Sequence, residues 1–323
     1  MKKGDVIIGL SAGGTKCSAN AAEYDGKGRF KPLFSHTFPT LGRGWREVFG
    51  DFDSAIDKFG ASPSAIGVIS GGPLDGDSGR IFSPPNLIGW DNVPAAKYFS
   101  DKYGVSAVLM NDADAGALAE WRFGAGRGYK NMIYLTFGTG MGAGLILDGR
   151  LYTGACNAAG EIGHVRLARK GVVGYGKSGS AESFVSGAGI ARAAKETAKR
   201  LIGSGKRCSF ARNLSEAENV TAKDVAESAA AGNADAVAIM RKTGEKLGEI
   251  LAVLTDILNP QLIVVGGIYA RNESLLSGYA LSAYKREALA RSREACTVSA
   301  AELGEKIDFY ASVSAVVYGC RTD

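Results

Sequence analysis

Residues that could carry out acid–base chemistry on a hydroxylated small molecule are concentrated between Asn111 and Glu182. The pair Asn111-Asp112 opens this segment, the run Gly160-Glu161-Ile162-Gly163-His164 lies within it, and Glu182 ends it. A positioned carboxylate can accept the proton of a hydroxyl group. Asn, Glu and His side chains can donate to or accept from further hydroxyls. The segment therefore predicts a site for a polyhydroxylated ligand, with Asp112 as the candidate base.

Two glycine-rich stretches follow short apolar runs. The first is Ser11-Ala12-Gly13-Gly14-Thr15-Lys16, and the second is a glycine-studded loop from Gly138 to Gly144. Such turns leave backbone N–H groups free to hold phosphate oxygens, and Thr15 and Lys16 could add a hydroxyl and a charge. A plain β-turn explains one glycine pair alone equally well. With the candidate base, the two stretches indicate a small-molecule kinase.

The two stretches belong to a pattern that occurs twice. The apolar run 6–10 leads into the first glycine stretch and then to the turn Asp25-Gly26, whereas 132–137 leads into the second and then to Asp148-Gly149. A repeated order of strand, glycine turn, strand and Asp-Gly turn predicts an internal duplication. Two such turns facing each other across a cleft would hold a polyphosphate from both sides.

The candidate base lies where a strand is expected to meet a helix. Residues 107–110 predict a buried strand, and a helix is expected from about Ala113 to Phe123. Asp112 would then lie at a helix N-terminus, where the helix dipole favours its ionised form. An ordinary N-cap aspartate is the alternative interpretation. Further helices are expected over 45–58, 234–258 and 307–318, and further buried strands over 65–69 and 262–267.

Length and composition favour a two-domain globular enzyme. The chain has 323 residues, of which 46% are hydrophobic and 22% charged, and no apolar run reaches the ~20 residues of a membrane helix. Its five cysteines are scattered without a Cys-x-x-Cys pair, which fits a reducing cytoplasm. The net charge of +5 is spread along the chain, so neither a nucleic-acid nor a membrane partner is expected. No signal peptide is expected, because Gly4 and Asp5 follow Met1-Lys2-Lys3 at once.

Two further motif matches lack the context that their chemistry needs. Residues 171–178 satisfy the Walker A pattern with Lys177, but an amphipathic and then basic stretch precedes them, and Gly179 and Ser180 follow where a helix should begin. Gly138-x-Gly140-x-x-Ala143 resembles a dinucleotide fingerprint, yet a strand and hairpin follow it instead of a helix. A P-loop NTPase that uses Lys177 remains a minor alternative.

Taken together, these residues resemble the ROK family (repressors, uncharacterised reading frames and sugar kinases). The resemblance implies an α/β, two-domain actin-like (ribonuclease H-like) ATPase fold, with a duplicated β-sheet core and an interdomain cleft. A smaller domain over 1–118, completed by a C-terminal helix at about 305–323, and a larger domain over 119–304 are expected. The resemblance rests on Gly13–Lys16, Ser70–Pro73, Pro85-Asn86-Leu87, Gly89-Trp90, Asn111-Asp112, Gly138–Gly144, Gly160–His164, Asn259-Pro260 and Gly266-Gly267.

The resemblance also implies an activity, which is the ATP- and Mg²⁺-dependent phosphorylation of a hexose or N-acetylhexosamine by a cytoplasmic homodimer. Asp112 matches the catalytic base. The residues that match sugar contacts are Gly72, Asn86, Asn111, Glu161, His164 and Glu182. The residues that match ATP contacts are Ser11, Gly13, Gly14, Thr15, Lys16, Gly138, Thr139, Gly140, Gly142, Gly266 and Gly267, the last two on the adenosine side.

One departure from the family pattern concerns catalysis. Family members usually carry an aspartate near the metal-bound phosphates where this chain has Ser11. A serine can hydrogen-bond a metal-bound water, but it brings no charge. The alternative to a kinase is therefore a catalytically weak or inactive sugar- or nucleotide-binding member of the same fold.

The other departures concern zinc and DNA. The family's zinc loop reads Cys-x-Cys-Gly-x-x-Gly-Cys-x-Glu, and all three cysteines are missing here, so we expect no structural zinc and assign no residue to a metal. His164 is then a sugar contact or a packed remnant. Only five residues precede Val6, so no DNA-binding helix-turn-helix is expected before it. The positions that match the zinc loop are Val173, Tyr175, Gly176, Gly179, Ser180 and Glu182.

Overall fold

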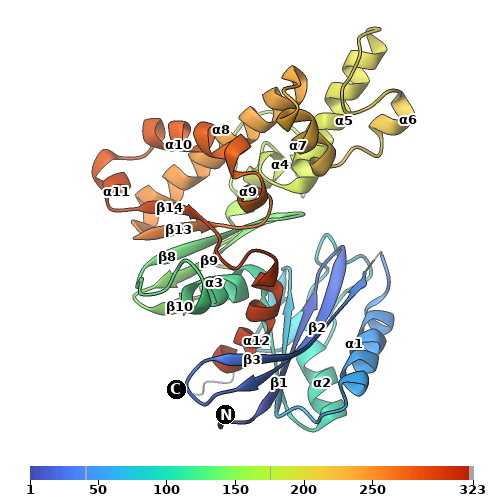
Figure 1. Cartoon of the computed structure of the whole chain (residues 1–323), viewed down its shortest axis with the longest axis vertical. Coiled ribbons are helices and arrows are strands. Elements are labelled where there is room, and N and C mark those ends of the chain that lie inside the picture. The colour runs from blue at the N-terminus through green and yellow to red at the C-terminus, as the bar shows by residue number, and fades with distance from the viewer. Residues whose placement is uncertain (41, 175, 320–323) are drawn as a thin grey trace.

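Two five-stranded mixed sheets form the centre of the molecule (Figure 1). The computed structural model describes residues 1–40, 42–174 and 176–319. The first sheet has the order β3-β2-β1-β4-β7, with β1 (Val6–Ala12), β2 (Lys16–Tyr24), β3 (Phe30–Pro39), β4 (Ala65–Ser70) and β7 (Ser106–Asn111). The second has the order β10-β9-β8-β13-β14, with β8 (Met132–Phe137), β9 (Met141–Leu147), β10 (Arg150–Tyr152), β13 (Leu262–Val265) and β14 (Thr297–Ala300).

The second sheet repeats the topology of the first. In each, the central strand pairs antiparallel with the strand that follows it and parallel with a later strand: β1 with β2 and β4, and β8 with β9 and β13. The outermost parallel pairs, β4 with β7 and β13 with β14, also correspond. The duplication expected from the sequence is thus confirmed in the strand order.

Helices cover both sheets and join them. Helices α1 (Trp45–Phe59) and α2 (Ala95–Tyr103) pack on the outer face of the first sheet, because Phe49, Phe52 and Phe99 share a buried cluster with Leu10 of β1. On the second sheet lie, among others, α5 (Gly187–Gly203), α8 (Ala234–Leu258) and α10 (Glu273–Glu287). The short helices are α4 (Ala181–Phe184), α6 (Leu214–Ala217), α7 (Ala222–Ala230), α9 (Ile268–Arg271) and α11 (Ala290–Glu294).

Two helices, α3 (Asp112–Phe123) and α12 (Ile307–Gly319), form a layer between the sheets (Figure 1). Ala117 and Leu118 of α3 pack against the second sheet, whereas Ala115 packs with Ala311 of α12 and Ile69 of β4. Because α3 starts where β7 ends, this layer carries Asp112 to the space between the sheets. Two short hairpins complete the fold: β5 (Leu74–Asp75) with β6 (Arg80–Ile81), and β11 (Val173–Gly174) with β12 (Lys177–Ser178).

The second glycine stretch is shorter than the sequence suggested. The expected loop from Gly138 to Gly144 is wrong from Met141 onward, since β9 begins there and Met141 pairs with Phe137. Met141 and Ala143 are buried in the core of the second sheet, which draws the chain back into a ladder after a turn of only Gly138-Thr139-Gly140. Among the described residues, no helix is both long and apolar enough to cross a bilayer.

Candidate active site

A cavity of about 690 Å³ opens between the two sheets. It brings together nearly all residues proposed from the sequence. Gly266 and Gly267 do not line it; they follow β13, and a Cβ on Gly267 would lie 2.1 Å from the Phe137 carbonyl oxygen, directly behind the second glycine turn. The proposed residues that line the cavity are Ser11, Gly13–Lys16, Gly72, Asn86, Asn111, Asp112, Gly138–Gly140, Gly142, Glu161, His164 and Glu182.

Asp112 is the first residue of α3, but it is not the residue that caps the helix. Asn111 is the N-cap, and its Oδ1 accepts hydrogen bonds from the amides of Ala113 (2.8 Å) and Asp114 (3.4 Å). The interpretation of Asp112 as an ordinary N-cap is therefore wrong. A Cβ on Gly71 would lie 3.9 Å from Asp112 Oδ2, so the carboxylate lies beside the turn that follows β4. Asn111 holds the helix start and leaves the Asp112 carboxylate to the cavity.

Further polar groups converge close to Asp112. A Cβ on Gly72 would lie 3.4 Å from Asn111 Nδ2 and 3.5 Å from Glu161 Oε1, so an amide donor and a carboxylate acceptor meet at this glycine. Glu161 directly precedes the 3₁₀ turn Ile162–His164, and the loop before it is tied to β9 by a hydrogen bond from the Ala143 amide to the Gly160 carbonyl (2.8 Å). Glu161, His164 and Asp112 are all exposed to the cavity. This end of the cavity can surround a molecule with several hydroxyl groups.

The first glycine turn lies at the other end of the cavity. The Gly13 amide bonds the Lys16 carbonyl (3.2 Å), and the Gly13 carbonyl accepts from the Thr40 hydroxyl (2.6 Å). The Thr15 carbonyl accepts from the Thr40 amide (3.1 Å). Among the described residues, the amides of Gly14 and Thr15 have no hydrogen-bond acceptor. The carbonyls of Gly13, Thr15 and Lys16 are thus hydrogen-bonded within the protein, and two amides of the turn are available for a ligand.

The second glycine turn is built in the same way. The Gly138 amide bonds the Gly140 carbonyl (3.0 Å), and the carbonyls of Gly138 and Thr139 accept from the first amides of α5, Gly187 (2.8 Å) and Ala188 (3.2 Å). The amides of Thr139 and Gly140 find no acceptor in the part of the chain that the structure describes. Free backbone amides of this kind bind phosphate oxygens.

Asn86 shows that the two turns face each other. A Cβ on Gly14 would lie 2.5 Å from Asn86 Cβ, and a Cβ on Gly140 would lie 4.0 Å from Asn86 Nδ2 and 2.6 Å from Glu182 Oε2. The same Glu182 oxygen accepts from the Met141 amide (3.1 Å). Asn86 therefore lies between the turns, and Glu182 is fixed to the second turn at the start of β9.

The carboxylates of the site influence one another. The depth of Asp112 between the sheets raises the pKa of its carboxyl, against hydrogen bonds from the amides of Ala113 and Asp112 itself, and the charge of Asp308 adds to the rise. Asp112 is exposed and lines the cavity, so solvent reaches it there, whereas the surrounding protein desolvates its carboxyl. The expectation that the helix dipole favours the ionised form has the wrong sign for the net effect, because desolvation outweighs it.

Two neighbouring acids show the same trend. Burial, and then the charge of Asp112, raise the pKa of Glu161. Burial also raises the pKa of Asp114 to about 7, with contributions from Asp112 and Glu161. A carboxylate with a raised pKa is the stronger proton acceptor. The clustering therefore suits Asp112 to accept a proton from a hydroxyl group.

The family of this chain follows from a comparison with known proteins. The model of the ROK family matches residues 7–308, which is most of the chain.

The chain belongs to the ROK family.

Its relatives include sugar kinases. It is 29% identical to a glucokinase of Streptomyces coelicolor over 307 residues, which cover 93% of this chain and 94% of that protein. It is 31% identical to an N-acetylmannosamine kinase of Citrobacter koseri over 215 residues, which cover 66% of each. A crystal structure of a ROK family glucokinase from Streptomyces griseus, in complex with glucose and AMPPNP, superposes with a TM-score of 0.80 at 27% identity, covering 97% of this chain and 99% of that one. This likeness confirms the actin-like ATPase fold.

Sequence reasoning missed one charged residue of this ROK site. Asp308, in the first turn of α12, lines the cavity and accepts a hydrogen bond from the Ser18 hydroxyl of β2. It lies far along the chain from the other site residues, in a stretch whose apolar character predicted only a closing helix. The packing of α12 against β1 brings Asp308 to the cavity. This packing is a tertiary contact that no local sequence pattern predicts.

The segment that corresponds to the family's zinc loop forms the β11–β12 hairpin, and its Tyr175 lies outside the described residues. Among the described residues, no group of three or more His, Cys, Asp or Glu side chains could hold a metal ion. Lys177, the lysine of the Walker A match, donates to the His164 carbonyl (2.7 Å) and does not line the cavity. No helix begins at Lys177, as a P-loop would require.

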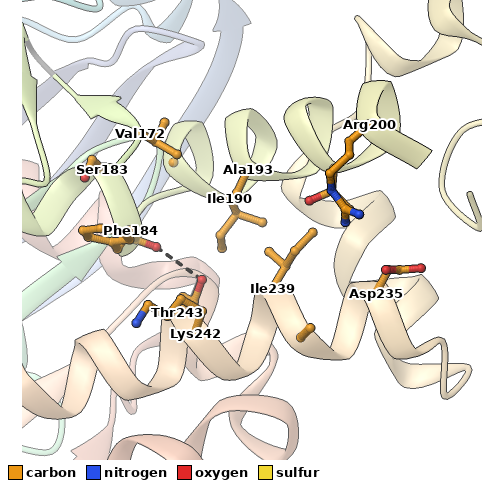
Figure 2. Close-up of a pocket in the computed structure, with 13 residues that line it drawn as sticks. Val172, Ser183, Phe184, Ile190, Ala193, Arg200, Asp235, Ile239, Lys242 and Thr243 are labelled. Atoms are coloured by element: carbon orange, nitrogen blue, oxygen red, sulfur yellow. Dashed lines mark hydrogen bonds between the residues drawn. The ribbon is translucent and has the colours of Figure 1, made fainter. Parts of the chain in front are cut away.

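A second, smaller cavity of about 290 Å³ lies between α5 and α8 (Figure 2). Ile190 and Ala193 of α5 face Ile239 of α8 across it, and Arg200 and Asp235 lie toward one end (Figure 2). Thr243 donates to the Phe184 carbonyl (3.3 Å) at the other end. It contains none of the residues proposed from the sequence.

Proposed function

We propose that this ROK protein is an ATP-dependent carbohydrate kinase that transfers the γ-phosphate to a hydroxyl of a hexose or N-acetylhexosamine. The main support is a single cavity with hydroxyl-binding side chains at one end and two facing glycine turns at the other. The relatives named above act on sugars of these two classes by their names. An acceptor hydroxyl and a polyphosphate would therefore meet within one enclosed space.

Asp112 is assigned as the general base. It accepts the proton of the attacking hydroxyl while the hydroxyl oxygen bonds to the γ-phosphorus, the bond from that phosphorus to the β,γ-bridging oxygen breaks, and ADP leaves. Asn111 Nδ2, Glu161 and His164 hold the neighbouring hydroxyls, and the convergence of Asn111 and Glu161 beside Gly72 fixes which hydroxyl reaches Asp112. One oxygen of Glu182 is held by the Met141 amide, and we assign its second oxygen to the sugar.

The glycine turns are assigned to the phosphates. The four amides of Gly14, Thr15, Thr139 and Gly140 donate to phosphate oxygens, and the exposed Lys16 adds a positive charge. Phosphoryl transfer needs little covalent chemistry from the protein, so positioning and charge stabilisation provide the rate. Mg²⁺ enters as part of the substrate Mg·ATP and neutralises phosphate charge. Gly266 and Gly267 support the second turn from behind and border the adenosine.

We further assign the two halves of the chain to domains that close on the substrates. Residues 1–118 with 305–323 carry the first glycine turn, and 119–304 carry the second. Closure would bring the turns together on the polyphosphate and keep water from the γ-phosphate.

ADP release tests this function. The purified protein is mixed with Mg·ATP and a panel of hexoses and N-acetylhexosamines. Release that depends on one sugar and is lost in Asp112→Asn is the expected result. Release that is independent of any sugar would contradict the proposal, because the acceptor would then be water.

A second candidate is a weak or inactive binding protein, and Ser11 is the observation that favours it. Ser11 is the penultimate residue of β1, lines the cavity and carries no charge. This alternative predicts sugar or AMPPNP binding by calorimetry without ADP release from any sugar. Turnover with any member of the panel excludes it.

A further inference from the structure

A carboxylate of α12 contacts the start of β2, the strand that follows the first glycine turn. Among the described residues that line the cavity, the acids are Asp112, Glu161, Glu182 and Asp308. Asp112 and Glu161 lie beside Gly71 and Gly72, and Glu182 is bound to the second turn. Asp308 of α12 is the remaining acid, and it is hydrogen-bonded to Ser18 in the sheet that carries the first turn.

The packing of α12 places Asp308 over the strand pair that carries Ser11. Helix α12 crosses the first sheet: a Cβ on Gly9 of β1 would lie 2.4 Å from Ser312 Oγ, and a Cβ on Gly67 of β4 would lie 2.7 Å from Val316 Cγ2. The first turn of α12 therefore reaches β2, where Asp308 accepts a hydrogen bond from Ser18. Ser18 is the residue paired with Ser11 across β1 and β2, and both Ser11 and Asp308 line the cavity.

A buried polar chain holds Asp308 in this place. Asn20 Nδ2 donates to Ser18 Oγ (3.0 Å) and to Ser312 Oγ (3.1 Å), and Ser35 donates to Asn20 Oδ1 (2.8 Å). Ser18, Asn20 and Ser312 are each at most 3% exposed. Since Ser18 Oγ already accepts from Asn20, its own proton is directed to Asp308. Satisfied buried networks of this kind hold a single arrangement.

The chemistry of these donors suits magnesium. Mg²⁺ binds oxygen ligands, keeps several waters, and is usually held by one or two carboxylates together with substrate phosphates. Asp308 supplies a carboxylate and Ser11 a hydroxyl at the turn that we assign to phosphate. Because the described residues hold no cluster of three acidic, His or Cys ligands, the other ligands of the cation would come from ATP and water.

We propose that Asp308 provides the protein carboxylate that binds the Mg²⁺ of Mg·ATP, directly or through its waters. This inference rests on the proposed kinase function and adds a residue to it. Asp308 of α12 then supplies the negative charge that Ser11 lacks. The serine at position 11 therefore does not by itself imply an inactive enzyme.

The test measures magnesium linkage by calorimetry instead of turnover. AMPPNP affinity is determined with Mg²⁺ and with EDTA for the wild type, Asp308→Asn and Glu305→Gln. Asparagine can still accept from Ser18, which preserves the fold, and thermal melting checks this. Glu305 is the matched control, because it precedes α12, is exposed and pairs with Arg271 outside the cavity.

The expected result is a gain in AMPPNP affinity from Mg²⁺ that falls by roughly 10- to 100-fold in Asp308→Asn and is unchanged in Glu305→Gln. The double variant Ser11→Asp with Asp308→Asn should regain much of the linkage, since it returns a carboxylate to the position paired with Ser18. A merely structural role for Asp308 would not allow this rescue.

Two results overturn the inference in distinguishable ways. A full magnesium linkage in Asp308→Asn would exclude Asp308 and leave the kinase proposal intact. Failure of the wild type to bind AMPPNP, with or without Mg²⁺, would overturn the proposed function together with the inference.

Discussion

The two ends of the large cavity offer a ligand different kinds of group. At the Asp112 end, the polar groups are side chains, and the pKa values of Asp112, Glu161 and Asp114 are all raised. At the glycine end, the donors are backbone amides, released by turns whose carbonyls are bound elsewhere. Ligand binding at the Asp112 end would depend on the functional groups of the side chains. Ligand binding at the glycine end would depend on how closely the backbone of each turn approaches the ligand.

This difference predicts which substitutions matter at each end. Isosteric changes that remove one charge should disable the sugar end with little effect on the fold. At Gly13 and Gly14 of the glycine end, an added methyl group should be harmful, because backbone oxygens of Lys16 and Asn86 already occupy that space.

Asp112→Asn should produce the largest effect, a fall in kcat of roughly 10²- to 10⁴-fold through loss of the general base. AMPPNP affinity should be retained, which isothermal calorimetry measures. Asp114→Asn is the matched control, since it makes the same change on the same helix but does not line the cavity. Equal losses in both variants would show that the charge of the cluster matters and not the position of Asp112.

Glu161→Gln should raise the KM for the sugar by roughly 10- to 100-fold, because a hydrogen bond to a charged acceptor contributes about 1.5–3 kcal/mol. The affinity for AMPPNP should not change. Glu196→Gln, on the exposed side of α5, provides the control. A variant that bound the sugar normally but had lost nucleotide affinity would reverse the assignment of the two ends.

Gly14→Ala should weaken AMPPNP binding by about 10-fold, since overpacking typically costs about 1–3 kcal/mol. The new Cβ would lie 2.5 Å from Asn86 Cβ and 2.7 Å from the Asn86 carbonyl oxygen, and the latter belongs to the backbone. Gly50→Ala in α1 meets no heavy atom within 4 Å and should be neutral or slightly stabilising. Unchanged nucleotide affinity in Gly14→Ala would remove the first turn from the phosphate site.

The smallest effect concerns the pH dependence of stability. Burial raises the pKa of Asp114 to about 7 in the folded state, from the ordinary value of 3.8. The folded protein therefore binds this proton more tightly than the unfolded chain, and the resulting stability is lost as pH rises from about 4 through 7. Asp114→Asn should show a smaller decrease in Tm between pH 5 and pH 8 than the wild type. Parallel Tm curves for the two proteins would contradict this.

The sequence predicted those parts of the molecule that local pattern determines. The long stripe of α8 gave the bounds 234–258 that the structure shows, and the repeated glycine pattern gave the duplicated sheets. Trp90 of the family motif Gly89-Trp90 is fully buried and donates to the Arg43 carbonyl. Long periodic elements and residue spacing within one motif are local properties and can be read from the chain.

The remaining features depend on tertiary contacts. Asn111 and Asp112 are equally good caps by residue type, and only the path of β7 decides that Asn111 takes this role. The net shift of the Asp112 pKa depends on how deep the residue lies, which the helix dipole argument could not include. Asp308 reaches the cavity only because Gly9 and Gly67 allow α12 to touch the sheet.

A crystal structure with the sugar identified by ADP release and with Mg·AMPPNP would test the central claim most directly. We predict a sugar hydroxyl within hydrogen-bonding distance of Asp112, and phosphate oxygens on the amides of the turns at Gly14 and Gly140. Either ligand bound elsewhere, for example in the cavity between α5 and α8, with the space between the turns still filled by solvent, would contradict the account.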